Sequence, residues 1–240
     1  ESDSEPDNYE GDFSKDQAAF HEEQDVRRTI FVEMSKRSST FTRDAIRTVI
    51  DTFPGMWSDF EFDFSRAPIF YPLNAVTIEK GNFSGARFYA GANFTSIADF
   101  HETRFTSDAD FCWATFTSNA DFYRTTFISN ADFQGARFTS IASFSKATFT
   151  RRVIFCSTTF TQYGPIFAMA DSEERKAQFS AGAEPRDYDF SVSSESKPIK
   201  CQTATLLGKS FTIPIGTILF DPDSWDKEKQ EYTRISEPVQ

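Results

Sequence analysis

Residues 98–163 read ADFHETRFTSD, ADFCWATFTSN, ADFYRTTFISN, ADFQGARFTSI, ASFSKATFTRR and VIFCSTTFTQY, a repeat of 11 residues. Each repeat holds two phenylalanines, and the spacing between successive phenylalanines alternates between five and six residues. A small residue, usually alanine or threonine, stands two positions before nearly every one. The twelve phenylalanines are Phe100, Phe105, Phe111, Phe116, Phe122, Phe127, Phe133, Phe138, Phe144, Phe149, Phe155 and Phe160.

This spacing is incompatible with one long helix. Residues five and six apart lie at different angles around a 3.6-residue helix, so the rings could not form one buried stripe. In an extended segment, by contrast, a small and a large residue two positions apart face the same side. Turn-forming residues follow each such pair. The sequence therefore predicts short extended segments joined by corners, stacked so that each unit buries the apolar side of its neighbour.

The units at residues 109–113 (ADFCW) and 131–135 (ADFQG) resemble the pentapeptide repeat, in the variant that alternates five- and six-residue units. The resemblance covers residues 81–163 and implies a mainly β fold, a right-handed four-sided parallel β-helix. It also implies one repeat per side, with the large residue pointing inward. It says little about function, because repeat proteins of one fold serve unrelated purposes.

Four sides of five, six, five and six residues make a coil of 22, so residues 22 apart should stack. We expect about four coils, spaced about 4.8 Å apart like paired strands. The expected columns are Phe111, Phe133 and Phe155; Phe100, Phe122 and Phe144; Phe105, Phe127 and Phe149; Phe116, Phe138 and Phe160. One irregularity is expected near Phe94, where a six-residue unit stands in place of a five-residue unit.

Composition divides the rest of the chain around this core. We predict a disordered acidic leader (1–15), a helical N-terminal cap (16–56), an irregular segment leading into the repeat (57–80), the β-helix (81–167), a linker (168–200), a C-terminal β-hairpin cap (201–225) and a solvated tail (226–240). Residues 1–25 hold ten acidic side chains and one lysine, a composition typical of disorder. No apolar run is long enough to span a membrane, so a soluble protein is expected.

The two caps are predicted from apolar periodicity. Within 16–56, one face of a first helix holds Ala19, Val26, Ile30, Phe31 and Met34, and a second helix is expected over residues 42–53. Their apolar faces should cover the first coil; a helical dimerisation unit is the alternative. Near the C-terminus, two short strands with a turn at Gly208 should close the last coil.

Few residues carry chemistry. The chain has two histidines, His21 and His101, in distant parts of the sequence, and its three cysteines, Cys112, Cys156 and Cys201, do not have metal-ligand spacing. Cys112 and Cys156 should lie two coils apart, beyond the reach of a disulfide. We predict no catalytic residue, no cofactor and no metal site. Three unpaired cysteines suit a reducing compartment, so a cytoplasmic location is expected.

An aspartate precedes many of the repeat phenylalanines, as in Asp99, Asp110, Asp121 and Asp132. Acidic clusters on a parallel β-helix would suit an enzyme that acts on polysaccharides, which is one alternative function. Each aspartate is part of the repeat itself, however, and hydrogen bonding to the backbone at the corners accounts for every copy.

The function that we favour is a non-enzymatic scaffold that presents a rigid surface to a protein partner of unknown identity, with a homo-oligomer also compatible. The candidate contact residues are His101, Trp113, Tyr123, Arg124 and Gln134. Trp113 is the most informative, because a tryptophan outside the inward positions has no packing role in the repeat.

A second alternative follows from the resemblance, since some pentapeptide-repeat proteins are similar to a DNA rod and protect type II topoisomerases such as gyrase. A surface that imitates phosphate should be strongly negative along its length. Residues 81–163 carry seven basic and six acidic side chains, which disfavours this mimicry. Direct nucleic-acid binding is also disfavoured, because no basic patch with interleaved aromatic residues occurs.

Overall fold

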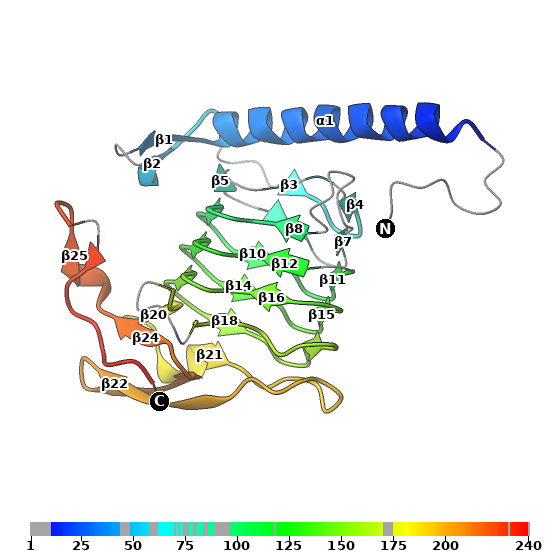
Figure 1. The fold of residues 1–240 in the computed structure, drawn as a ribbon. Coiled ribbons are helices and arrows are strands. Elements are labelled where there is room, and N and C mark those ends of the chain that lie inside the picture. The colour runs from blue at the N-terminus through cyan, green and yellow to red at the C-terminus, as the bar shows by residue number, and fades with distance from the viewer. Residues whose placement is uncertain are drawn as a thin grey trace.

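The computed structural model describes residues 11–43, 49–57, 62–69, 71, 73, 77–78, 81–83, 86–88, 97–117, 119–169, 175–229 and 231–239. Within these residues, one α-helix, α1 (Phe13–Ser38), lies across one end of a stack of short parallel strands, and a hairpin lies across the other end (Figure 1). The fold is mainly β, as the repeat predicts.

Four parallel sheets form the sides of the stack, and we call them faces I to IV. Face I contains β3 (Phe62–Asp63), β6 (Gly81–Asn82), β10 (Ala109–Asp110), β14 (Ala131–Asp132), β18 (Val153–Ile154) and β21 (Tyr188–Asp189). Face II contains β4 (Pro68–Ile69), β7 (Arg87–Phe88), β11 (Thr115–Phe116), β15 (Arg137–Phe138) and β19 (Thr159–Phe160). Face III contains β8 (Ile97–Asp99), β12 (Asn119–Asp121) and β16 (Ala142–Ser143). Face IV contains β5 (Thr77–Ile78), β9 (Arg104–Phe105), β13 (Thr126–Phe127), β17 (Thr148–Phe149), β20 (Gln178–Ser180) and β24 (Ile218–Phe220).

The chain visits faces I, II, III and IV in turn, so face I lies opposite face III. In the middle of the stack, paired residues are 22 apart, as in Ala109 with Ala131 and Thr126 with Thr148. All twelve phenylalanines that the repeat places inward are at most 1% exposed. Their rings stack in the four expected columns, with centroids 4.4 to 5.0 Å apart.

The ladders continue beyond the predicted β-helix at both ends. Phe64 stacks on Phe83 at 5.3 Å, Phe179 on Phe149 at 5.1 Å and Phe190 on Phe155 at 5.9 Å. The prediction of a linker over 168–200 is therefore wrong in part, since β20 and β21 extend faces IV and I, with a 3-10 turn at Pro185–Asp187 before β21. Strand β21 could not be predicted from the repeat, because Tyr188 stands at the position where the repeat has a small residue.

The irregularity near the start of the repeat is larger than predicted. Gly81 pairs with Ala109, 28 residues away instead of 22, and Arg87 pairs with Thr115 in the same way. The additional six residues fall between Phe88 and Phe100. The bulge expected at Phe94 lies outside the described residues.

The N-terminal region holds one helix and a hairpin, not two helices. Strand β1 (Ser39–Arg43) pairs antiparallel with β2 (Val49–Pro54) where the second helix was expected. Threonine and β-branched residues in both segments favour strands over helix. Among the described residues, no helix is long and apolar enough to cross a membrane.

Helix α1 also turns a different side to the stack than its apolar pattern predicts. Phe31 is buried and packs against Phe64 at 5.3 Å and Tyr71 at 6.4 Å between ring centroids. Val26 and Ile30, predicted to share that buried face, are 53% and 54% exposed. Phe31 provides the aromatic ring that ends the ladder of face I, and Gln24 and Val32 also pack on this side of the helix.

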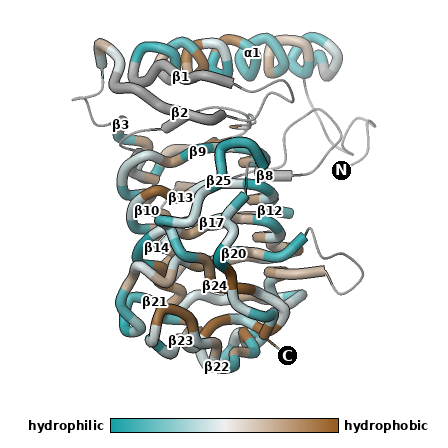
Figure 2. Tube along the Cα trace, turned by 90° about the vertical axis from the view of Figure 1, so that its left-hand side faces the viewer, coloured by the Kyte–Doolittle hydropathy of each residue, from teal (hydrophilic) through white to brown (hydrophobic). Residues whose placement is uncertain are grey.

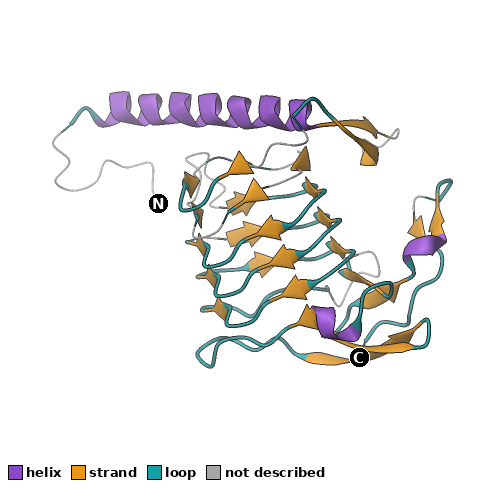
Figure 3. Cartoon of the chain, turned by 180° about the vertical axis from the view of Figure 1, so that it is seen from behind, coloured by secondary structure: helices purple, strands orange, loops and turns teal. Residues whose placement is uncertain are grey.

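The opposite end is closed by the hairpin of β22 (Cys201–Leu206) and β23 (Lys209–Pro214), seen from behind in Figure 3. Ala204, Phe211 and Ile213 are buried, and Phe211 packs on Tyr188 at 5.7 Å. Thr203 and Thr212, on the other side of the hairpin, are exposed. An apolar inner face and a polar outer face are typical of terminal caps in stacked repeats.

The C-terminal tail is packed, whereas the sequence predicted a solvated segment. After a 3-10 turn at Pro222–Ser224, strands β25 (Trp225–Asp226) and β26 (Glu231–Tyr232) form a small hairpin beside face IV (Figure 2). Tyr232 stacks on Phe220 at 4.1 Å, and Arg234 forms an ion pair with the buried Asp221. The stack of Tyr232 on Phe220 and the ion pair of Arg234 with the buried Asp221 therefore hold this segment, which the polar composition of residues 226–240 did not indicate.

Candidate partner-binding surface

The corners that follow faces I and III are tight turns with a left-handed residue. In the first regular example, the N–H of Thr103 donates to the carbonyl of Phe100 at 2.9 Å, and Glu102 has φ of 56°. The same turn position has positive φ at Arg66, Glu102, Trp113, Arg124, Gly135, Lys146 and Ser157. Only one of these seven is glycine, although left-handed backbone is costly for other L-residues.

The aspartates of the repeat serve these turns. In each, the backbone N–H two positions ahead donates to Oδ1 at 2.8 to 2.9 Å, as in His101 to Asp99, Cys112 to Asp110, Tyr123 to Asp121 and Gln134 to Asp132. The predicted corner role of the aspartates is therefore confirmed. These carboxylates are already engaged by the backbone and are spread over two opposite faces.

The five candidate contact residues do not lie together. His101, Tyr123 and Arg124 are at the corner between faces III and IV, where the chain passes from β8 to β9 and from β12 to β13. Trp113 and Gln134 are at the corner between faces I and II, which is diagonally opposite. The sequence identified outward positions correctly but could not show on which corner each one stands without the order of the faces.

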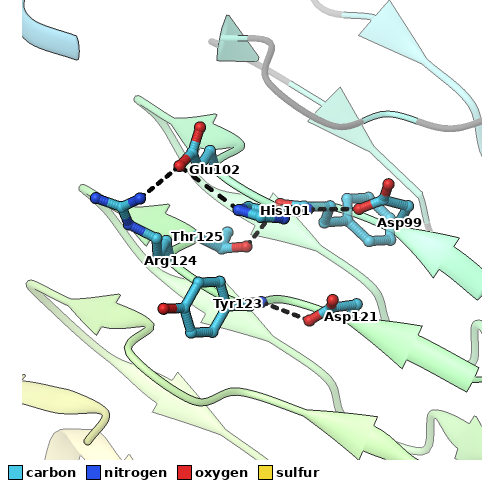
Figure 4. A network of polar contacts seen from close by, with 8 residues as sticks. Asp99, His101, Glu102, Asp121, Tyr123, Arg124 and Thr125 are labelled. Atoms are coloured by element: carbon cyan, nitrogen blue, oxygen red, sulfur yellow. Dashed lines mark hydrogen bonds and ion pairs between the residues drawn. The ribbon is translucent and has the colours of Figure 1, made fainter. Parts of the chain in front are cut away.

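A polar network covers the corner between faces III and IV (Figure 4). Nη1 of Arg124 contacts Oε1 of Glu102 at 2.7 Å, and Nε2 of His101 lies 3.5 Å from the same oxygen. The rings of His101 and Tyr123 meet edge to face, with centroids 5.2 Å apart. Lys146 takes the turn position of the next coil, so this corner carries a column of charged side chains.

The next coil contains more residues than the coil above at the same corner. Phe167 stacks on Phe144, and Phe179 on Phe149, but 12 residues separate Phe167 from Phe179 where the coil above uses five. The segment leaves and returns through a bridge between Ala168 and Lys176. The guanidinium of Arg175, which precedes this bridge, lies 5.9 Å from the ring centroid of Tyr123, within the range of a cation–π contact.

We define the III/IV corner surface as His101, Glu102, Tyr123, Arg124, Lys146 and Arg175. Sequence reasoning missed Glu102 and Lys146, although their spacing of 22 from Arg124 on either side contains the signal. It could not have found Arg175, because nothing in the linear sequence shows that the inserted segment returns to Tyr123.

Trp113 has a packing role that the sequence did not reveal. A Cβ added at Gly135 would stand 2.4 Å from the Trp113 ring, so the indole lies directly against this glycine of the next coil. The expectation that Trp113 has no packing role is corrected, although its side chain remains 63% exposed. In the adjacent column, burial is the main cause that raises the pKa of the Cys112 thiol, and Asp110 and Asp132 raise it further.

Across the part of the chain that the structure describes, no group of three or more histidine, cysteine or acidic side chains is arranged to hold a metal ion. Cys112, Cys156 and Cys201 are free thiols. The chemistry available at the corner surface is charge, hydrogen bonding and aromatic contact.

The fold defines a solenoid of stacked strands whose interior is filled by phenylalanine ladders. Residues 89–135 match the family model described as pentapeptide repeats (9 copies), so the chain carries pentapeptide repeats, as its sequence pattern indicates. Comparisons with curated proteins and with solved structures give no match.

Proposed function

We propose that this chain is a non-enzymatic scaffold that presents the III/IV corner surface to a protein partner. Pentapeptide repeats generally build structural proteins, which supports the scaffold. The corner surface supports the interaction role, because it joins charged, aromatic and hydrogen-bonding side chains on one rigid edge.

The observation that carries the proposal is the column of Glu102, Arg124 and Lys146, with φ of 56°, 57° and 59°. A left-handed residue other than glycine costs roughly 1 kcal/mol, so folding alone would favour glycine at all three positions. The equivalent column at the I/II corner is mixed, with Arg66, Trp113, Gly135 and Ser157, and only the first of these is charged. Strain that persists at a column made entirely of charged, solvent-accessible residues is a reason to infer a function there.

The rigid spacing of these three residues also supports a role in binding. The three charged residues stand on successive coils, which the strand ladder holds about 4.8 Å apart. Such a surface loses little conformational freedom when it binds, so more of the contact energy becomes affinity.

The two alternatives fit the surface less well. A mimic of DNA needs a continuous negative surface, whereas Arg124, Lys146 and Arg175 outnumber Glu102 at this corner. An enzyme acting on polysaccharides needs carboxyl groups that converge on a substrate, whereas the repeat aspartates accept backbone hydrogen bonds at separate turns.

Quantitative affinity capture tests the proposal. The bait carries Tyr123→Ala, Arg124→Glu and Lys146→Glu, and a matched control carries Trp113→Ala and Gln134→Ala at the I/II corner. We expect proteins captured by the wild type to be lost by the first variant and retained by the second, with both variants unfolding near the wild-type temperature. Equal capture by all three folded baits would contradict the assignment of this surface.

A further inference from the structure

Helix α1 carries large apolar side chains on two sides. The side toward the stack carries Gln17, His21, Gln24, Arg28 and Phe31, and Val32 also packs against the core. The opposite stripe carries Ala19, Glu23, Val26, Ile30, Glu33 and Arg37, spaced alternately by four and three residues. Such spacing places one continuous seam on one side of a helix. Val26 and Ile30, at the centre of this seam, are more than half exposed.

The seam is open to another molecule. The stack contacts α1 from one side only, and the helix forms the outer surface at this end (Figure 1). β-branched residues such as Val26 and Ile30 are less favourable in an exposed helix than alanine or lysine. Their place on the outward side therefore needs a reason other than helix formation.

The charges of α1 indicate which partner fits. The first half, Phe13–Asp25, has four acidic side chains and one basic, and the second half, Val26–Ser38, has four basic and one acidic. A second copy of the same helix laid antiparallel would therefore bring each half against a half of opposite net charge, although a register with Val26 opposite Ile30 also places Glu23 of one copy opposite Glu33 of the other. A parallel arrangement would bring like charges together.

We propose that two copies of this chain associate through an antiparallel pair of α1 helices. In this pair, Val26 of each copy packs against Ile30 of the other, at the centre of a twofold-symmetric contact. Arg37 of one copy then lies opposite Ala19 of the other, where the small side chain lets it exchange its contact with Trp57, 5.0 Å away in its own chain, for Glu22 or Glu23 one turn away. This dimer is independent of the III/IV corner surface, which remains available on both copies.

The contact is small, so the dimer should be weak. Two helices of this length bury on the order of 1,000 Å² in total, at the lower end of specific interfaces. The seam holds two large apolar side chains per copy. We expect a dissociation constant in the micromolar range that rises with salt, because much of the complementarity is electrostatic.

Sedimentation velocity on the full chain, over a series of concentrations, tests the dimer. The wild type should shift from monomer to dimer as concentration rises through the micromolar range. Ile30→Glu should remove the dimer, whereas the matched control Ile141→Glu, also an exposed apolar position but outside the seam, should leave it unchanged. A wild type that stays monomeric at about 500 μM, or equal effects of the two substitutions, overturns the proposal.

A charge exchange provides a second readout that helix unfolding could not produce. The variant Glu22→Lys and the variant Arg37→Glu should each weaken self-association at least tenfold. An equal mixture of the two should restore it, because each reversed side chain meets one of opposite sign in the heterodimer. If the mixture associates no better than the separate variants, the antiparallel pairing is wrong.

Discussion

Phe133 illustrates at the scale of one residue why the core is intolerant of change. Its ring is fully buried and lies 5.0 Å from the rings of both Phe111 and Phe155 in its own column. Phe122 and Phe144 meet it edge to face from the neighbouring column, at 5.6 and 5.5 Å. The strand ladder fixes the distance between coils, so the coils cannot collapse into a space that a lost ring would leave.

Replacing this ring should therefore cost nearly the full penalty of a cavity. We predict that Phe133→Ala lowers the free energy of unfolding by about 3 to 5 kcal/mol, measured by urea denaturation. Phe20→Ala, at a half-exposed position on α1, is the control and should cost less than about 1 kcal/mol. Similar losses in both variants would mean that the ladder does not carry the stability.

Substitution of Gly135 by a residue with a Cβ should be destabilising for two separate reasons. Its φ of 66° is unfavourable for any residue with a Cβ, and that Cβ would overlap the Trp113 ring. We predict that Gly135→Ala costs about 2 kcal/mol in the wild type and about 1 kcal/mol when Trp113→Ala is also present. A double-mutant cycle by denaturation measures the difference, and additive effects would show that the indole does not lie against this glycine.

Asp99 should make stability depend on pH. Burial is the largest cause that raises the pKa of Asp99 above its ordinary value of 3.8, while the N–H of His101 opposes that shift. Because the folded pKa lies above the unfolded one, ionisation from about pH 4 upward costs folded-state stability. Unfolding free energies from pH 3 to 7 should therefore fall relative to Asp99→Asn as pH rises; the opposite trend would contradict this environment.

At the scale of the elements, the sequence predicts the strands that belong to the periodic repeat. It does not predict elements whose position depends on contacts with residues distant in the sequence. Columns such as Phe111 over Phe133 follow from spacing alone, because each rung repeats the same local chemistry. The rotation of α1 and strand β21 do not, since contacts between residues distant in the sequence, such as Phe31 on Phe64 and Phe211 on Tyr188, contribute to them. The five candidate contact residues remain a prediction, and the corner on which each one stands could not be told without the order of the faces.

The inserted segment between Phe167 and Phe179 should serve binding more than folding. Deleting residues 170–176 gives this corner the five-residue spacing of the coil above. The accompanying Met169→Gly places a glycine at the position that is left-handed in the other coils. We predict a change in unfolding free energy of less than about 1 kcal/mol, because a shorter loop costs less closure entropy, and a loss of the captured partner. A protein that no longer folds would show that the segment is structural.

At the scale of the whole molecule, both ends of the stack are covered, by α1 and β1–β2 at one end and by β22–β23 at the other (Figures 1 and 3). Covered ends restrain further coils from adding edge to edge, which open strands would otherwise permit. Association between copies is therefore expected through side chains on the outside, at the seam of α1, and not through the strands of the last coil.

Thiol cross-linking gives the most direct measurement of the 22-residue coil. In a background with all three cysteines changed to serine, Thr126→Cys with Thr148→Cys places two thiols on paired strands of face IV, about 4.8 Å apart. Thr126→Cys with Arg137→Cys, only 11 residues apart, places them on opposite faces. Dibromobimane, which joins only neighbouring thiols, should link the first pair within one molecule and leave the second unlinked; efficient linking of the second pair, or none of the first, would contradict the four-sided coil.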